Sequence, residues 1–210
     1  MHIQCFTTNP FFENSYLIWD DNLQGIIIDP GFYTPEEEHS FLDFVNNKGI
    51  QMKDCWLTHA HIDHIFGCNF IYKQYGIKPR MHANEEFIYQ SANQVLTMYG
   101  LNNFEFPSLG EFIHEAEELR LGKHLFATLF TPGHSPGSSS FYCEEQNLIF
   151  SGDVLFEGSI GRTDLPGGDH NTLINSIKFS LMHLPNSTVV YSGHGGLTSI
   201  GQEKLTNPFL

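Results

Sequence analysis

Short apolar runs alternate with helical patterns along the first part of the chain. Apolar and β-branched runs between turn residues predict strands, which fall at residues 2–8, 14–19, 25–28 and 52–57. Thr34-Pro35-Glu36-Glu37 predicts the start of a helix, because proline and acidic residues favour a first helical turn. This helix is expected to run to about Asn47 and to stop near Gly49. Residues 68–75 predict a shorter helix that ends at Gly76.

The remainder of the chain continues this mixture. Further strands are predicted at residues 78–83, 117–121, 125–131, 138–143 and 147–151, with the last strand at 188–192. Helices are predicted at residues 84–93 and 171–184, the second being amphipathic with Leu173, Ile174, Ile177 and Leu181 on one face. Residues 94–114 mix aromatic residues with glycine and proline, which indicates either a lid that borders a pocket or an exposed edge of the core.

Composition narrows the class of protein. A chain of 210 residues fits one domain, and its formal charge of -14 argues against a nucleic-acid partner, which needs clustered Lys and Arg. The sequence has neither an apolar run of about 20 residues nor a secretory signal, so we expect no membrane partner. Four cysteines without C-x-x-C spacing predict buried free thiols in a reducing cytoplasm. The sequence does not indicate an oligomeric state.

The densest group of candidate ligands follows the strand predicted at residues 52–57. His59, His61, Asp63 and His64 lie within six positions, between that strand and the helix at 68–75. Imidazole nitrogen and carboxylate oxygen together suit Zn²⁺, Fe or Mn²⁺. His59 and His61 share one face of an extended segment, whereas Asp63 and His64 are adjacent and cannot point at the same spot as that pair. The spacing therefore predicts two neighbouring metal positions.

This H-x-H-x-D-H pattern resembles the signature of the metallo-β-lactamase superfamily. The later ligands of that superfamily have counterparts in His134, Asp153 and His194, each of which follows an apolar run and is flanked by glycine. The resemblance extends over nearly the whole chain. It implies an α/β fold, a four-layer αβ/βα sandwich with the metal site at one edge between the two sheets. It also implies a single domain over residues 1–210, without a C-terminal helical domain.

The resemblance also implies the roles of individual residues. One metal would be held by His59, His61 and His134, the other by Asp63, His64 and His194, with Asp153 bridging the two. Asp63 and Asp153 are the expected catalytic carboxylates, and two zinc ions are the expected cofactors, with iron or manganese as alternatives. Asp29 resembles a residue that steadies a ligand without binding metal, although it also reads as a turn residue before Pro30-Gly31.

The loop at residues 156–169 resembles that of glyoxalase II-like hydrolases and of persulfide dioxygenases. In those families a basic residue there binds a carboxylate of the thiol carrier, and Arg162 takes that place here; alternatively, Arg162 pairs with Asp164 or Asp169 to brace the loop. Glyoxalase II proper has a tyrosine where this chain has Gly196, and a further helical domain. The chain is therefore most similar to the short, single-domain glyoxalase II-like hydrolases.

The expected activity is hydrolysis of S-lactoylglutathione or a related acyl thioester, a small molecule, by a metal hydroxide at a binuclear centre. One alternative is a mononuclear iron persulfide dioxygenase that uses only His59, His134 and Asp153. Others are a hydrolase of another ester or lactone, and a non-enzymatic metal-binding protein.

Overall fold

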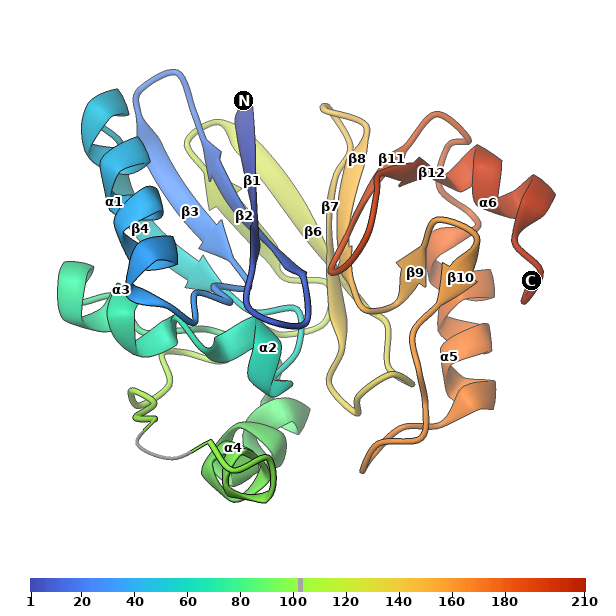
Figure 1. The fold of residues 1–210 in the computed structure, drawn as a ribbon. Coiled ribbons are helices and arrows are strands. Elements are labelled where there is room, and N and C mark those ends of the chain that lie inside the picture. The colour runs from blue at the N-terminus through green and yellow to red at the C-terminus, as the bar shows by residue number, and fades with distance from the viewer. Residues whose placement is uncertain (102–103) are drawn as a thin grey trace.

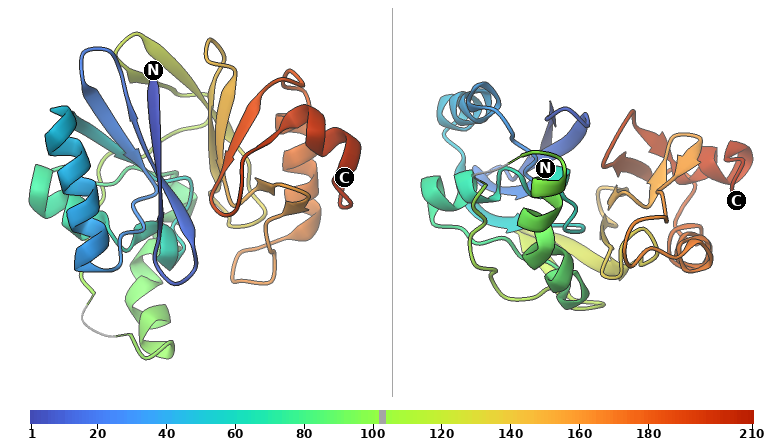
Figure 2. Two further views of the ribbon diagram at one scale, coloured as in Figure 1. Left: turned by 45° about the horizontal axis from the view of Figure 1, so that its top comes forward. Right: turned by 60° about the horizontal axis from the view of Figure 1, so that its bottom comes forward.

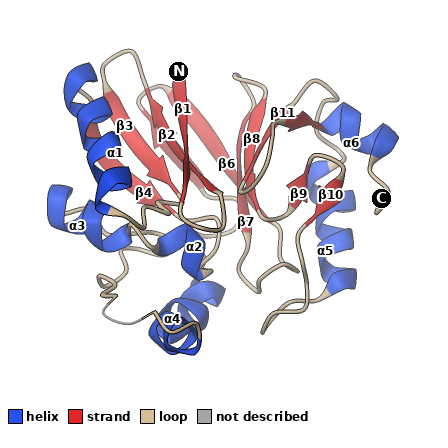
Figure 3. Ribbon diagram, viewed as in Figure 1, coloured by secondary structure: helices blue, strands red, loops and turns tan. Residues whose placement is uncertain are grey.

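Two β-sheets pack against each other with helices on their outer faces (Figure 1, Figure 3). The computed structural model describes residues 1–101 and 104–210. The first sheet has the order β1 (His2–Thr8), β2 (Glu13–Trp19), β3 (Gln24–Ile28) and β4 (Gln51–Trp56). Its strands are antiparallel except for the parallel pair β3–β4. Helices α1 (Pro35–Lys48) and α3 (Cys68–Tyr75) cover its outer face.

The second sheet is mixed and contains six strands. Their order is β12 (Thr198–Ser199), β11 (Val189–Ser192), β8 (Leu148–Gly152), β7 (Ser139–Cys143), β6 (His124–Phe130) and β5 (Glu118–Leu121). Only β8 and β11 are parallel. Helices α5 (His170–Ser176) and α6 (Ile200–Thr206) lie on its outer face, beside the small pair β9 (Leu155–Phe156) and β10 (Ser159–Ile160). The predicted four-layer sandwich is confirmed.

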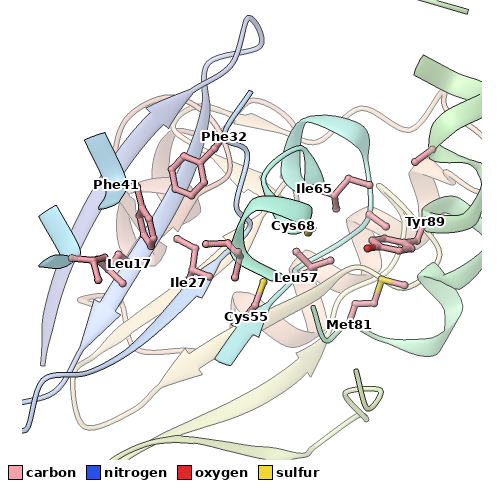
Figure 4. Close-up of a cluster of buried hydrophobic side chains, with 14 of the residues drawn as sticks. Leu17, Ile27, Phe32, Phe41, Cys55, Leu57, Ile65, Cys68, Met81 and Tyr89 are labelled. Atoms are coloured by element: carbon pink, nitrogen blue, oxygen red, sulfur yellow. The ribbon is translucent and has the colours of Figure 1, made fainter. Parts of the chain in front are cut away.

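Strand alternation divides the apolar side chains among three cores. In β2, Leu17 packs under α1 with Phe41, whereas the next residue, Ile18, faces the second sheet. Figure 4 shows the first of these cores, in which Phe32 and Phe41 lie against the sheet and Cys55 and Cys68 lie below them. The third core joins the second sheet to α5 and α6. Each sheet is covered on both faces. Functional side chains are therefore accessible only where the strands end, at an edge of the sandwich.

The helix ends of the first half follow the predicted signals. Thr34 and Glu37 form a capping box at the start of α1, and Gly49 ends the helix in the left-handed conformation. Helix α3 spans Cys68–Tyr75 and stops at Gly76, as predicted. A short helix, α2 (Ile62–Ile65), precedes it. Among the described helices, none is both long and apolar enough to cross a bilayer.

Several predicted elements differ in the structure. Residues 78–83 form no strand; Arg80 and His82 make only isolated bridges, and a 3₁₀ turn at Ala83–Glu85 leads into α4 (Glu86–Met98). Helix α4 therefore occupies the start of the segment 94–114, which was interpreted as a loop or lid bordering a pocket or as an exposed edge of the core; residues 102–103 of that segment lie outside the described part of the chain. The helix continues because no glycine or proline occurs before Gly100.

The C-terminal elements also need correction. The helix predicted at 171–184 is α5 followed by a π-helical turn at Ile177–Leu181, which shifts the apolar residues relative to a regular helix and leaves Ile174 only partly buried. Strand β11 is not the last strand, because the chain turns back and adds β12 antiparallel to it. Among the cysteines, Cys5 is exposed rather than buried, since it lies on the edge strand β1.

Candidate metal centre

Seven side chains converge at one edge of the sandwich, next to α2 and α4. The right panel of Figure 2 brings forward the end of the molecule on which α4 lies. His59 and His61 lie in the loop after β4, while Asp63 and His64 belong to α2. Asp153 follows β8 directly, His194 follows β11, and His134 lies in the turn after β6. These are the residues predicted from the sequence: His59, His61, Asp63, His64, His134, Asp153 and His194. The parallel pairs β3–β4 and β8–β11 bring their carboxyl ends to the same edge, which explains the convergence.

The first group consists of His59, His61 and His134, whose ring nitrogens lie within 4.8 Å of one another. His134 Nε2 is 2.8 Å from His61 Nδ1 and 3.2 Å from His59 Nε2. Burial and the neighbouring rings lower the pKa of all three, that of His61 to about 3. The rings are therefore neutral and present lone pairs to a common point.

The second group consists of Asp63, His64 and His194. Asp63 Oδ2 lies 3.2 Å from His194 Nε2 and 3.8 Å from His64 Nε2. Burial lowers the pKa of His64, but the carboxylates of Asp153 and Asp63 outweigh it and raise that pKa well above its ordinary value. This half of the site is thus rich in negative charge that a cation can neutralise.

Asp153 lies between the two groups. Its Oδ1 is 3.3 Å from His64 Nε2, and its Oδ2 is 3.6 Å from both His134 Nε2 and His194 Nε2. Burial raises the pKa of this carboxyl, but His64 beside it lowers the pKa below the ordinary value. Gly193 packs so closely that a methyl group in its place would collide with the Asp153 carboxylate and the His64 ring. One carboxylate therefore contacts both groups, as its predicted bridging position requires.

The ring nitrogens that point away from the site determine which nitrogen of each histidine faces it. Nδ1 of His134 lies 2.8 Å from the Arg162 carbonyl, and Nδ1 of His194 lies 3.1 Å from the Phe11 carbonyl. Because a carbonyl only accepts, each Nδ1 carries a proton, and Nε2 is the nitrogen that faces the site. Nδ1 of His64 likewise faces the Asp29 carboxylate, 3.1 Å away. Ligating histidines in metalloproteins are held in this way.

Asp29 is placed as the sequence predicted, behind a ligand. It accepts from the backbone N–H and the hydroxyl of Thr58 at 2.7 and 2.6 Å, in addition to its contact with His64. Asp29 also has a left-handed φ of 49°, so it is a turn residue as well, and both sequence interpretations apply. It lies within ligand distance of His59 and His64, but Thr58 and His64 already occupy its oxygens.

The donor set fits divalent metal ions. His64 Nε2 and Asp153 Oδ1 are buried and have no hydrogen-bond partner among the described residues, although buried polar atoms are normally paired. Both atoms face the convergence point of the two groups. Five imidazoles and two carboxylates with nitrogen and oxygen donors are the chemistry of Zn²⁺ and related ions.

Sequence reasoning missed two buried glutamates beside the site. Glu85 accepts from the backbone of Ala60 and Gly137 and from the Ser135 hydroxyl. Glu13 lies 3.8 Å from His64 Nδ1 and accepts from the hydroxyls of Thr8 and Ser15. Burial raises the pKa of both carboxyl groups. Neither has a sequence signal, because a glutamate at a strand or helix start is ordinarily exposed.

A pocket of about 660 Å³ is lined by five of the seven side chains, His61, Asp63, His134, Asp153 and His194. Arg162 lines it, but its guanidinium donates to both oxygens of Asp164 at 2.7 Å, and this pair is largely exposed. Asp169 instead caps α5 by accepting from the Thr172 N–H. Of the two interpretations of Arg162, the structure shows the ion pair, with Asp164 as the partner.

Comparison with known proteins identifies relatives along the whole chain. A family model described as the metallo-beta-lactamase superfamily matches residues 8–194. Hydroxyacylglutathione hydrolase GloC of Haemophilus influenzae is 37% identical, over 100% of this chain and 98% of the relative. The probable metallo-hydrolase YqgX of Bacillus subtilis is 40% identical, over 96% and 93%. The crystal structure of TTHA1623 in a di-iron-bound form has a TM-score of 0.88 and 36% identity, covering 99% of this chain and 100% of that one.

Proposed function

The chain belongs to the metallo-beta-lactamase superfamily, and we propose that it is a binuclear metallo-hydrolase that cleaves acyl thioesters, with residues 1–210 acting as one domain. The observation that carries this proposal is the position of Asp153, whose carboxylate contacts both groups of candidate ligands. A single carboxylate between two groups of donors is the arrangement of a two-metal hydrolytic site.

In this proposal one divalent ion is held by His59, His61 and His134, the other by Asp63, His64 and His194, and both by Asp153. We assign zinc first; the di-iron form of TTHA1623 supports iron as the alternative. When bound, the ions supply a water activated near neutral pH and a Lewis acid for the reacting carbonyl.

The chain's own residues supply orientation. The Arg162 and Phe11 carbonyls accept from Nδ1 of His134 and His194, so that Nε2 of each ring is directed at the site. Asp63 and Asp153 are the carboxylates at the floor of the pocket, where they would hold the ions next to the reacting carbonyl.

A thioester is favoured over other acyl substrates by the relatives. The Haemophilus influenzae protein is named a hydroxyacylglutathione hydrolase, and its sequence aligns with this chain end to end. Hydrolysis is also the class in the name of the Bacillus subtilis relative.

The test measures metal content and activity together. Protein loaded with zinc or iron is assayed for metal per chain, for hydrolysis of S-lactoylglutathione, and for oxygen uptake with glutathione persulfide. About two ions per chain with thioester cleavage supports the proposal. One iron per chain with oxygen uptake and no cleavage contradicts it and assigns the persulfide dioxygenase alternative.

A further inference from the structure

One face of α4 forms an apolar wall of the pocket. Phe87, Ser91, Val95 and Tyr99 recur every four residues and all line it, so they lie on one side of the helix. The adjoining face, with Tyr89, Ala92 and Leu96, is buried against the first core. Helix α4 therefore has two apolar faces. Packing against the core accounts for one of them, and the other borders the pocket.

The opposite walls are apolar as well. Phe11 comes from the β1–β2 turn, Phe156 from β9, and Leu165 and Pro166 from the loop after β10. These segments are remote in sequence and meet only around the opening to the metal centre. Phe11 and Phe87 remain 43% and 74% exposed, which is costly for large apolar groups unless a ligand covers them.

The charge of the lining does not match an anionic carrier. Arg162 is the only lysine or arginine among the described residues that line the pocket, and Asp164 already neutralises it through two hydrogen bonds. Glutathione carries a carboxylate at each end, so it would find no free cation on these walls. Burying an unpaired carboxylate against apolar side chains is unfavourable.

We infer that the pocket takes an uncharged, apolar group of the substrate, so that the preferred substrates are neutral alkyl or aryl acyl thioesters rather than conjugates of glutathione. The reaction in this inference, thioester hydrolysis, rests on the proposed function. The preference of the pocket for an uncharged, apolar group does not. The apolar group belongs either to the acyl chain or to the thiol, because both are attached at the reacting carbonyl, which must reach His61, Asp63 and Asp153 at the pocket floor.

Two series of substrates show whether the apolar group that the pocket binds belongs to the acyl chain or to the thiol. In one, the acyl chain of N-acetylcysteamine thioesters is lengthened from acetyl to hexanoyl; in the other, an acetyl group is kept and the thiol is lengthened from ethyl to hexyl. We expect kcat/KM to rise roughly threefold for each methylene in at least one series. We also expect S-hexanoyl-N-acetylcysteamine to be cleaved at least as efficiently as S-hexanoylglutathione. Flat responses in both series, or a tenfold preference for the glutathione carrier, would overturn the inference.

A binding measurement separates this inference from the proposed reaction. Calorimetry with the non-hydrolysable thioethers S-hexyl-N-acetylcysteamine and S-hexylglutathione should show tighter binding of the neutral compound, whether or not the protein cleaves thioesters. If no thioester is cleaved but the neutral thioether binds more tightly, the proposed function fails and the pocket inference stands. Tighter binding of S-hexylglutathione overturns the pocket inference.

A matched pair of variants locates the binding. Phe87→Ala removes an apolar side chain from the pocket rim, and Phe179→Ala removes one of similar exposure, 71%, that does not line the pocket. Both positions are exposed, so both variants should fold. We expect Phe87→Ala to weaken binding of the neutral hexyl thioether about tenfold and Phe179→Ala to leave it unchanged. Equal effects of the two variants, or a change only in self-association with Phe87→Ala, would overturn the assignment of this wall to the substrate.

Discussion

The backbone N–H of Ala60 donates a hydrogen bond of 2.8 Å to Oε2 of Glu85. Ala60 lies between His59 and His61, and the other oxygen of Glu85 accepts from Ser135 Oγ and Gly137 N at 2.6 Å each. Ser135 directly follows His134, and Gly137 lies two residues further along. One buried carboxylate thus ties together the two loops that carry the first group of candidate ligands.

We expect Glu85→Gln to lower the metal affinity of the first group about 10- to 100-fold, as is typical when a residue that orients ligands is changed. The amide nitrogen of glutamine would face N–H and O–H donors in place of a carboxylate oxygen, so the free energy of unfolding should also fall by about 1–3 kcal/mol. Metal titration and thermal unfolding measure the two effects. Glu86→Gln, the same change one residue later at a position whose side chain accepts a hydrogen bond from Gln90, should alter neither. An unchanged metal affinity in Glu85→Gln would show that the brace is not needed for the site.

Asp29→Asn is expected to weaken metal binding at the second group. The variant replaces one carboxylate oxygen by an amide nitrogen, which donates and does not accept. The side chain would then no longer hold the proton of His64 on Nδ1, and the ring could adopt either tautomer. We expect a loss of about 10- to 100-fold in affinity for the ion at the second group, with a smaller effect on the other ion. Stepwise metal titration separates the two sites. Asp21→Asn, at an exposed position on the β2–β3 turn, serves as the control. Equal losses at both sites would mean that Asp29 acts on the fold as a whole.

Asp153→Ala should abolish hydrolysis and reduce metal content, because this carboxylate contacts histidines of both groups. The protein should still fold, since the change removes a buried charge from the edge of the sandwich and leaves the three cores intact. Metal per chain and kcat are measured on protein with a normal circular dichroism spectrum, beside Asp43→Ala on the exposed side of α1. Unchanged metal content and unchanged kcat would refute the shared position of Asp153.

Asp164→Ala is expected to shift the enzyme towards anionic carriers. Arg162 holds the pKa of the Asp164 carboxyl down to about 2, so this acid is ionised at neutral pH and neutralises the guanidinium. Removing it frees Arg162 for a substrate carboxylate, and KM for S-hexanoylglutathione should fall roughly tenfold, the equivalent of about 1.4 kcal/mol. KM for the N-acetylcysteamine thioester should stay constant. The double variant Asp164→Ala/Arg162→Ala should lose the gain; if the gain persists, Arg162 is not its source.

Local patterns along the chain were enough to predict the layers of this protein. The alternation of Leu17 and Ile18 places them on opposite faces of β2, and the caps of α1 at Thr34 and Gly49 fall where proline, acidic residues and glycine indicated. Local spacing predicted the motif from His59 to His64, whereas His134, Asp153 and His194 were named only through the resemblance to a family; the structure brings all seven side chains together. Elements and motif could be predicted because periodicity, capping and ligand spacing are properties of neighbouring residues.

Tertiary structure alone decided how those residues meet and what surrounds them. The brace at Glu85 depends on distances between loops that no sequence spacing encodes, and the structure selects Asp164 over Asp169 as the partner of Arg162. The apolar wall arises only when α4, the Phe11 turn and β9 meet around the site. The π-helical turn after α5 was not indicated by any local pattern. The sequence determined the candidate chemistry, whereas the packing of distant segments determined the pocket that would choose a substrate.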